Sequence, residues 1–221
     1  MNGKLIVIEG LDGSGKATQA KLLYDALLQQ GKSVQKVSFP NYESPSSSLV
    51  KMYLDGQFGQ SAADTGAYAA SAFYTVDRYA SYKTVWGSFY HSGGIVLADR
   101  YTTSNAIHQC SKLPPAEWDA YLDWLFDFEY TKIAIPAPQL VIYLSVSPEV
   151  SQKLMTKRYD GNEAKKDIHE RDIAYLEKSR QAAAYCAKKC NWITVTCCEN
   201  GEMRDIQSIH QEIVAYVSAI L

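Results

Sequence analysis

The stretch GLDGSGKAT, residues 10–18, constrains the fold of this chain more than any other part of the sequence. It lies directly after an apolar, strand-like run (residues 4–9) and directly before a segment with helical periodicity (residues 16–31). This is the setting of a GxxxxGK phosphate-binding loop, whose glycines let backbone N–H groups converge on an oxyanion at the positive end of a helix. The loop therefore predicts binding of a nucleoside triphosphate. The residues expected to contact its phosphates are Gly10, Gly13, Ser14, Gly15, Lys16, Ala17 and Thr18.

Other interpretations of this loop explain less of it. A glycine-rich turn without a ligand does not account for the lysine, and a dinucleotide-binding GxGxxG loop needs a different glycine spacing. A GTPase would also need a guanine-reading Asn-Lys-x-Asp segment, which this sequence lacks. ATPases and small-molecule kinases remain as candidate classes.

Ala17 stands where the usual loop carries a serine or threonine. A methyl group cannot ligate Mg²⁺, so the metal would be held by phosphate oxygens, by water and by other protein oxygens. The candidates are the Thr18 hydroxyl and the carboxylates of Asp12 and Asp99.

Apolar runs alternate with longer helical segments along the chain, which predicts an α/β fold with a parallel sheet and helices on both faces. A chain of 221 residues, 47% hydrophobic, is long enough for one sizeable core, so we expect a single domain spanning residues 1–221. The expected strands are KLIVIE (4–9), SVQKVSF (33–39), GIVLAD (94–99), LVIYLSV (140–146) and WITVTC (192–197).

Charge and composition limit the partners. A formal net charge of −2 provides no basic surface for nucleic acid or an anionic membrane. The chain starts without a recognisable leader pattern, and no segment reaches the ~20 apolar residues of a membrane span. An odd number of cysteines, without the spacing of a disulfide framework or a zinc knuckle, fits a reduced, cytoplasmic protein. They are Cys110, Cys186, Cys190, Cys197 and Cys198.

A second anion site is expected beside the phosphate loop. Asp99 and Arg100 follow the third strand, where a carboxylate can take a metal's water shell and an arginine can clamp a phosphate. Tyr74 and Arg78 are four residues apart, so one helix face projects a ring and a guanidinium together, suited to a nucleobase. The segment FPNY, residues 39–42, adds a loop at a strand's carboxyl end, where ligands of open α/β sheets bind.

In this order, the phosphate loop, FPxY, aromatic-x-x-x-Arg and DRYxxSN resemble the thymidylate kinases over nearly the whole chain. The resemblance implies a five-stranded parallel sheet of the P-loop nucleotide-kinase fold, a small mobile lid at about residues 157–172 and a homodimer formed through helices. It also implies transfer of the γ-phosphoryl group of Mg-ATP to dTMP, giving dTDP and ADP.

For the acceptor nucleotide, the resemblance implies that Tyr74 stacks on thymine, where relatives usually carry phenylalanine. Arg78 would bond the thymine carbonyl, Asn105 the N3 edge and Arg100 the monophosphate. The residues assigned to dTMP are Asp12, Phe39, Tyr42, Tyr74, Arg78, Arg100, Asn105 and His108.

For the transfer itself, the resemblance places Asp12 near the sugar 3′-hydroxyl and the metal-bound phosphates. Asp99 would lie near Mg²⁺, and Thr18 takes over the hydroxyl position that Ala17 lacks, as in some family members. Because the loop carries Gly13 and no arginine, transition-state charge is expected from the lid. Its cations are Lys157, Arg158, Lys165, Lys166 and Arg171, of which Arg158 is the one selected. Lys16, Arg100, Asp99, Asp12 and Arg158 are thus the expected catalytic residues.

The sequence also departs from the family pattern. Many relatives have an arginine at the position of Asn41, and His108 stands where a bulky aromatic often lies near the sugar 2′ position. His91, His169 and His210 form no ligand constellation and are expected on the surface.

Simpler interpretations stay open for individual residues. Tyr74 could be a core aromatic competing with Phe73, Val76 and Tyr79 for a buried helix face, and each lid cation could belong to a solvated surface. Asp77–Arg78 and Asp99–Arg100 could be structural ion pairs. At the level of function, the alternatives are a kinase for another nucleoside monophosphate and a non-catalytic ATP-binding module.

Overall fold

The five predicted apolar runs form one parallel sheet in the order β2-β3-β1-β4-β5, so the predicted α/β class is confirmed. The computed structural model describes residues 2–59, 61, 64–158 and 173–221, with backbone only for residues 155, 157, 158 and 173–175. The strands of the sheet are β1 (Lys4–Gly10), β2 (Val34–Ser38), β3 (Ile95–Asp99), β4 (Leu140–Ser145) and β5 (Ile193–Thr196).

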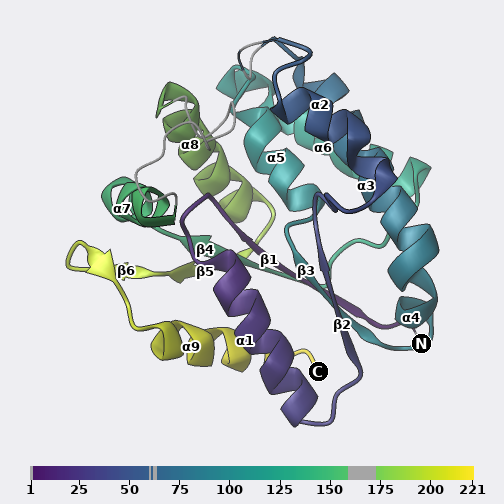
Figure 1. Ribbon diagram of the computed structural model, residues 1–221, viewed down its shortest axis with the longest axis vertical. Helices are drawn as coiled ribbons and strands as arrows, with labels where there is room; N and C mark the ends of the chain where they lie inside the picture. Colours follow the sequence, from purple (N-terminus) through teal and green to yellow (C-terminus); the bar gives the residue numbers. More distant parts are fainter. Residues whose placement is uncertain (1, 60, 62–63, 159–172) are drawn as a thin grey trace.

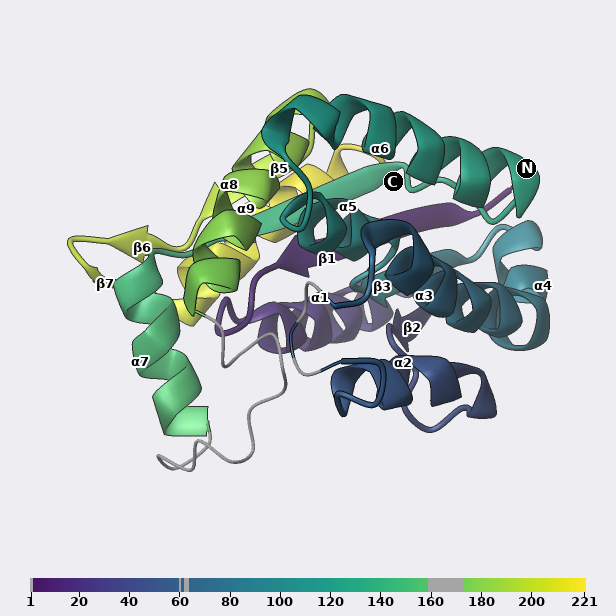
Figure 2. The same ribbon diagram turned by 90° about the horizontal axis from the view of Figure 1, so that it is seen from above.

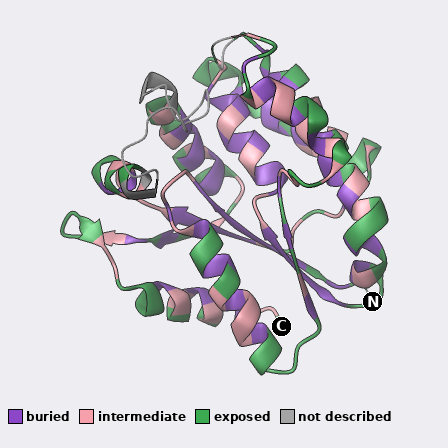
Figure 3. Cartoon of the chain, viewed as in Figure 1, coloured by how far each residue is buried: buried purple, intermediate pink, exposed green. Residues whose placement is uncertain are grey.

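The central strand β1 is buried on both faces, which is why its sequence is a continuous apolar run and does not alternate (Figure 3). Ile6 and Ile8 face one helix layer, whereas Leu5 and Val7 face the other. In register, Ile6 lies opposite Leu97 of β3. The sheet is therefore the middle of three layers.

Figure 1 shows these layers, with α1 and α9 below the sheet and α3, α5 and α8 above it. Seen from above, in Figure 2, α5 lies over the strands of the sheet, with α8 to its left and α3 to its right. The longer helices are α1 (Lys16–Gln29), α3 (Ala67–Ser81), α5 (Thr102–Cys110), α6 (Trp118–Phe126), α7 (Pro148–Arg158), α8 (Ile173–Lys189) and α9 (Ile206–Ser218).

Short helical turns join these helices to the strands. Two π-helical turns extend α3 and α6, and 3₁₀ turns precede α2 and α6. The shorter elements are η1 (Pro45–Ser47), α2 (Ser48–Leu54), η2 (Tyr82–Trp86), α4 (Gly87–His91), η3 (Pro115–Glu117) and η4 (Asp127–Lys132).

A small antiparallel hairpin, β6 (Cys198–Glu199) and β7 (Glu202–Met203), follows β5 and was not predicted. Asn200 and Gly201 connect its strands with φ of +51° and +77°. Positive φ at both central residues is typical of the Asn-Gly hairpin turn.

The order of the strands places three loops at one edge of the sheet. The chain goes from β1 through α1 to β2, returns to β3 beside β1, and continues to β4 on the other side of β1. The loops after β1, β2 and β3 therefore meet at the carboxyl edge, where open α/β sheets bind ligands. Among the described residues, none of the helices combines the length and apolar composition that crossing a bilayer requires.

Candidate active site

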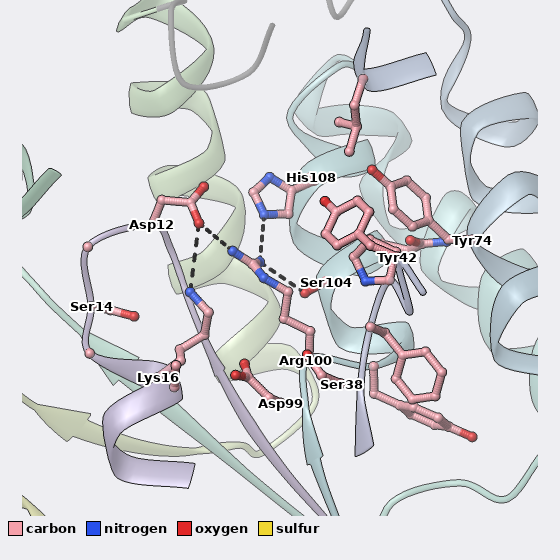
Figure 4. A pocket seen from close by; sticks show the side chains of 18 of the residues that line it. Asp12, Ser14, Lys16, Ser38, Tyr42, Tyr74, Asp99, Arg100, Ser104 and His108 are labelled. Atoms are coloured by element: carbon pink, nitrogen blue, oxygen red, sulfur yellow. Dashed lines mark hydrogen bonds and ion pairs between the residues drawn. The ribbon is translucent and has the colours of Figure 1, made fainter. Parts of the chain in front are cut away.

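A pocket of about 710 Å³ lies where these three loops meet, and Figure 4 shows the side chains around it. The phosphate loop forms one end, and α3 and α5 form the other. Its lining includes every residue predicted to contact phosphate or dTMP except Gly10. These residues are Asp12, Gly13, Ser14, Gly15, Lys16, Ala17, Thr18, Phe39, Tyr42, Tyr74, Arg78, Arg100, Asn105 and His108, and the pocket is also lined by Asp99, which was predicted to lie near Mg²⁺.

The phosphate loop has the geometry of an anion cradle. Gly13 and Gly15 adopt φ of +74° and +82°, which side chains with a Cβ rarely tolerate. Gly15 is the N-cap of α1 and has no side chain to cap the first N–H groups of the helix. These N–H groups remain available to an oxyanion at the positive end of the helix.

Ser14 adds a hydroxyl to this cradle. Its side chain is buried, and Oγ forms no hydrogen bond with any residue that the structure describes. A buried hydroxyl without a partner costs free energy, which a phosphate oxygen at this loop would recover.

Lys16 is buried at the start of α1, and its Nζ donates to the carbonyl oxygen of Leu11 at 2.9 Å. The Oδ1 atom of Asp12 lies 3.9 Å from the same Nζ. Burial, together with the positive charge of Arg100, lowers the pKa of Lys16 to about 8, although nearby carboxylates oppose this shift. The ammonium group is thus held in a buried site that disfavours its charge, and a bound phosphate would stabilise that charge.

Arg100 lies in the middle of the pocket, directly after β3. Its Nη2 donates to Oδ1 of Asp12 at 2.6 Å. Its Nη1 donates to Ser104 Oγ at 3.2 Å and lies 3.2 Å from His108 Nε2. Burial lowers the pKa of Arg100, but the carboxylates of Asp12, Glu9 and Asp99 outweigh burial and hold that pKa above its ordinary value.

The backbone of Arg100 is in the left-handed region, with φ of +67°, where a residue with a long side chain is strained. Such strain costs about 1–3 kcal/mol and tends to occur at functional sites. The N–H of Arg100 donates to the carbonyl oxygen of Ile8 at 3.1 Å, which ties the turn to β1. This turn aims the guanidinium across the sheet edge at the phosphate loop (Figure 4).

Glu9 is a site residue that the sequence analysis missed. Its carboxylate is buried at the end of β1 and accepts hydrogen bonds from the N–H of Gly10 and the hydroxyls of Thr103 and Ser104, and Arg100 Nη1 lies 3.7 Å away. The signal was available, because a lone acid ends an otherwise apolar strand directly before the loop. Glu9 therefore ties the phosphate loop to the start of α5.

Asp99 ends β3, and its carboxylate lines the pocket below Lys16 and Arg100 (Figure 4). No residue in the described part of the chain donates a hydrogen bond to this carboxylate, so it remains available to a cation or to water. Among the described residues around the phosphate loop, the carboxylates of Glu9, Asp12 and Asp99 act on the charges of Lys16 and Arg100. A carboxylate oxygen that faces the pocket, as in Asp99, is the kind of donor that Mg²⁺ takes directly or through water.

The opposite end of the pocket is aromatic. Tyr74 lines it from α3, Tyr42 and Phe39 line it from the loop after β2, and Tyr53 packs edge-on against Tyr74 with ring centroids 6.4 Å apart. Val76 and Tyr79 do not compete with Tyr74 for a buried face, because they are 51% and 43% exposed. Tyr74 itself is only half-buried and lines the pocket, so the simpler interpretation of Tyr74 as a core residue is wrong.

Arg78 also lines this end, but it is almost fully buried and its partner was not foreseen. The guanidinium forms a two-pronged ion pair with Glu129 of η4, in which Nε donates to Oε2 at 2.8 Å and Nη2 donates to Oε1. Burial lowers the pKa of Arg78, and the charge and hydrogen bonds of Glu129 outweigh burial and raise that pKa above its usual value. The expected alternative, an Asp77–Arg78 pair, is wrong.

Asp77 binds the loop after β2 and not Arg78. Its Oδ2 accepts from the backbone N–H of Asn41 at 2.8 Å, and its Oδ1 accepts from the Ser46 hydroxyl at 2.6 Å. Asp77 therefore fastens the loop after β2 to α3, next to the arginine that faces the pocket. For Arg100, likewise, the ion pairs that the structure shows are with Asp12 and Glu9 and not with Asp99.

Asn105 is buried on α5, and its Nδ2 donates to the carbonyl oxygen of Ser71 at 3.2 Å. This bond fixes which way the amide points and leaves Oδ1 as an acceptor. One end of the pocket thus combines the ring of Tyr74, the guanidinium of Arg78 and the oriented amide of Asn105. These groups can stack on a base and form hydrogen bonds with its edge.

Several predictions fall outside this site. Residues 159–172, with Lys165, Lys166, His169 and Arg171, lie outside the described residues, as do the side chains of Lys157 and Arg158. His91 is exposed and bonds Tyr82 and Asn2, whereas His210 is half-buried and not fully on the surface as expected. All five cysteines are free thiols, and the described residues contain no cluster of metal ligands.

Comparison with known proteins agrees with the geometry. The profile of the thymidylate kinase family matches residues 8–213. A thymidylate kinase from Mycobacterium tuberculosis is 29% identical over 177 residues, 79% of this chain and 81% of that protein. A probable thymidylate kinase from Staphylothermus marinus is 32% identical over 152 residues, 69% of this chain and 68% of that protein.

A solved structure has the same fold. The thymidylate kinase from Candida albicans superposes with a TM-score of 0.73, covering 99% of this chain and 92% of that chain at 20% identity. The shared architecture includes the five-stranded parallel sheet with flanking helices.

Proposed function

Because the chain belongs to the thymidylate kinase family, we propose that it transfers the γ-phosphoryl group of ATP to dTMP, forming dTDP and ADP for dTTP synthesis. Thymidylate kinases are phosphotransferases with ATP as donor. One observation carries the proposal: a single pocket joins an anion cradle to an end that can read a base. Donor phosphates and acceptor nucleotide can therefore meet inside it.

The ATP phosphates occupy the loop in this proposal. Backbone N–H groups of Gly13 and of residues 15–18, together with the Ser14 hydroxyl, donate to phosphate oxygens, and Lys16 supplies a buried positive charge. The phosphate also stabilises the ammonium form of Lys16, which burial disfavours.

The base of dTMP occupies the aromatic end. Tyr74 stacks on the ring, with Phe39 and Tyr42 as further walls. Asn105 accepts the N3–H of thymine through Oδ1, since its amide nitrogen is already bonded to Ser71, and Arg78 donates to the carbonyl at position 4. Cytosine reverses both polarities, because its N3 is an acceptor and its 4-amino group is a donor, so the same pair of residues rejects it.

The acceptor phosphate then lies between the two ends, at Arg100. This guanidinium is fixed by Asp12, Ser104 and His108, and its planar fork suits a phosphate. Asp12 and His108 would lie near the sugar, which places them close enough to sense its hydroxyl groups.

The transfer needs alignment and charge neutralisation more than proton removal, because the acceptor oxygen is already anionic. Lys16 and Arg100 hold the two phosphates from opposite sides and offset the charge on the transferred group. Arg158, in the lid proposed at residues 157–172, is assigned to add a further cation on closure. The closed lid would exclude water and so suppress ATP hydrolysis.

Magnesium fits the donor set of this site. Asp99, partly through water, and the Thr18 hydroxyl would hold it, and both line the pocket beside the loop. When bound, the ion supplies positive charge that offsets the β- and γ-phosphates. Ala17 contributes only its backbone N–H to this arrangement.

We propose one kinase domain over residues 1–221 that works as a homodimer in the cytoplasm. The outward stripe of α3 carries Ala69, Ala72, Val76 and Tyr79, an apolar surface that a second copy could cover. The free cysteines fit a reducing compartment.

A panel of acceptors tests the function. ADP release is measured with Mg-ATP and dTMP, dUMP, UMP, CMP, dCMP, AMP or GMP, with a control that lacks acceptor. A strong preference for dTMP is the expected result. Turnover with a different acceptor would identify a kinase for another nucleoside monophosphate, and ATP binding without any turnover would identify a non-catalytic module.

A further inference from the structure

Glu129 is a fully buried carboxylate that has no role in the proposed phosphoryl transfer. It lies in η4 and contacts Arg78, but it is not among the residues that line the pocket. No motif in the sequence pointed to it. Its place continues the buried face of α6, after Leu122 and Leu125, where an apolar residue is the ordinary choice.

Four hydrogen bonds fix this carboxylate completely. Arg78 donates to both of its oxygens through Nε and Nη2. Thr75 Oγ1 donates to Oε1 at 2.9 Å, and Thr102 Oγ1 donates to Oε2 at 2.6 Å. The donors come from α3 and from the start of α5, so Glu129 cannot rotate without breaking bonds to two helices.

The same bonds fix the guanidinium of Arg78. Its side edge, Nε and Nη2, is used by Glu129, and Nη1 is 3.4 Å from the carbonyl oxygen of Tyr101. A guanidinium has five N–H donors in one rigid plane. Fixing the side edge therefore also sets the direction of the end edge, which is formed by the outer N–H groups of Nη1 and Nη2. That end edge belongs to a residue that lines the pocket beside Tyr74 and Asn105.

Charge gives a second argument. A bare arginine at this end would attract the acceptor phosphate, which carries most of the nucleotide's charge. Arg78 and Glu129 together carry no net charge, so Arg78 keeps its directional N–H donors without attracting the phosphate, which finds positive charge at Lys16 and Arg100.

We propose that Glu129 is the positioning residue for base selection: through its two-pronged bond it aims Arg78 at the carbonyl at position 4 of the pyrimidine. The proposal rests on the proposed function, since it assumes that the base of dTMP binds at this end. Stability alone is a poor reason for such a pair, because replacing a buried ion pair by apolar residues is often neutral or stabilising.

The test uses Glu129→Gln, which keeps the size of the side chain but cannot accept hydrogen bonds from both Nε and Nη2 of Arg78. The KM for dTMP should rise about 10- to 100-fold, the factor expected for a lost hydrogen bond from a charged donor. The KM for ATP should change less than about twofold, because the phosphate loop is untouched. The matched control is Asp127→Asn in the same η4 segment, which removes only a surface carboxylate 3.5 Å from Lys132 and should leave both constants unchanged.

The analogue of dTMP with sulfur in place of the oxygen at position 4 isolates the contact, because sulfur is a weak acceptor and N3–H is retained. Wild type should prefer dTMP over this analogue, and Glu129→Gln should lose most of that preference. In an Arg78→Met background, adding Glu129→Gln should not change the preference further, since Glu129 acts through Arg78.

Three results would overturn the proposal: a folded Glu129→Gln variant with unchanged preference, KM values for ATP and dTMP that rise together, or an effect that persists in the Arg78→Met background. If Glu129→Gln does not fold, Thr102→Val removes one of the four bonds to Glu129. It should raise the KM for dTMP about threefold, less than the loss of a full hydrogen bond to a charged group because the other three bonds remain, without affecting the KM for ATP. An unchanged KM in that variant would count against the proposal. A wild-type enzyme that does not phosphorylate dTMP would instead refute the proposed function.

Discussion

Nη2 of Arg100 and Oδ1 of Asp12 are 2.6 Å apart, and this contact joins the turn after β3 to the phosphate loop after β1. The two residues are far apart in the sequence, and the parallel pairing of β1 with β3 brings them together. The link places the cation proposed for the acceptor phosphate next to the loop proposed for the donor phosphates.

Arg100→Lys should lower kcat/KM for dTMP by about 100-fold or more, because an ammonium cannot reproduce a planar fork that bonds Asp12 and a phosphate together. Steady-state kinetics with varied dTMP measure the effect. Arg204→Lys, which changes a surface pair with Glu212, is the control and should behave as wild type. Equal kinetics for both variants would remove Arg100 from the site.

Lys16→Ala should lower kcat/KM by at least about 1,000-fold, since the lysine supplies charge in a buried site where electrostatic effects are large. Lys21→Ala is matched to it, because Lys21 lies on the same helix but is exposed and paired with Asp25. The control should keep full activity in the same assay. A mild effect of Lys16→Ala would contradict the assignment of the phosphate loop.

The affinity for ATP should depend on pH through Lys16, whose pKa is lowered to about 8. The ammonium form binds phosphate and is present below this pKa, so it is lost from the free protein as pH rises through about 8. Bound phosphate raises the pKa, and affinity should therefore fall above about pH 8 by up to about tenfold per pH unit.

Calorimetric titration of ATP between about pH 7.5 and pH 9.5 measures this, because phosphate groups are already fully ionised there. In Lys16→Ala the remaining affinity should not follow this slope. A flat profile for the wild-type protein would show that Lys16 keeps its charge and that burial does not control its proton.

Ala17→Ser restores the hydroxyl of the usual loop. If Thr18, Asp99 and water already hold Mg²⁺, the Mg²⁺ dependence of the rate should change less than about threefold. A chelator should abolish turnover by both proteins. Thr18→Val provides the contrast and should weaken the apparent affinity for Mg²⁺; a large gain from Ala17→Ser would instead mean that the natural loop binds metal poorly.

Val76→Glu should convert the proposed homodimer to a monomer, because it places a charge in the middle of the apolar stripe of α3. Light scattering after gel filtration should give about twice the chain mass of 24.6 kDa for the wild type and a single chain mass for the variant. Leu28→Glu, at a 46% exposed position of α1, should remain dimeric. A wild-type monomer would refute the dimer.

Local signals in the sequence determined much of this protein. Apolar runs predicted the five strands, most clearly for β1, which is buried on both faces and needs no alternation, and less so for β2 and β5, which keep polar, partly exposed positions. Gly13, Gly15 and Lys16 identified the phosphate loop in the sequence, because backbone geometry and a place directly before a helix are local properties. The hairpin at Asn200-Gly201 carried a local signal too, but it was overlooked.

The tertiary structure alone decided which charged side chains are partners. Arg78 pairs with Glu129 and not with its neighbour Asp77, and Glu9 supports the start of α5 from the end of β1. Such pairs depend on which elements pack together and on where burial makes an unpaired charge costly, and neither appears in a local stretch of sequence. The residue types of the site could be read from the sequence, whereas their orientation came from packing.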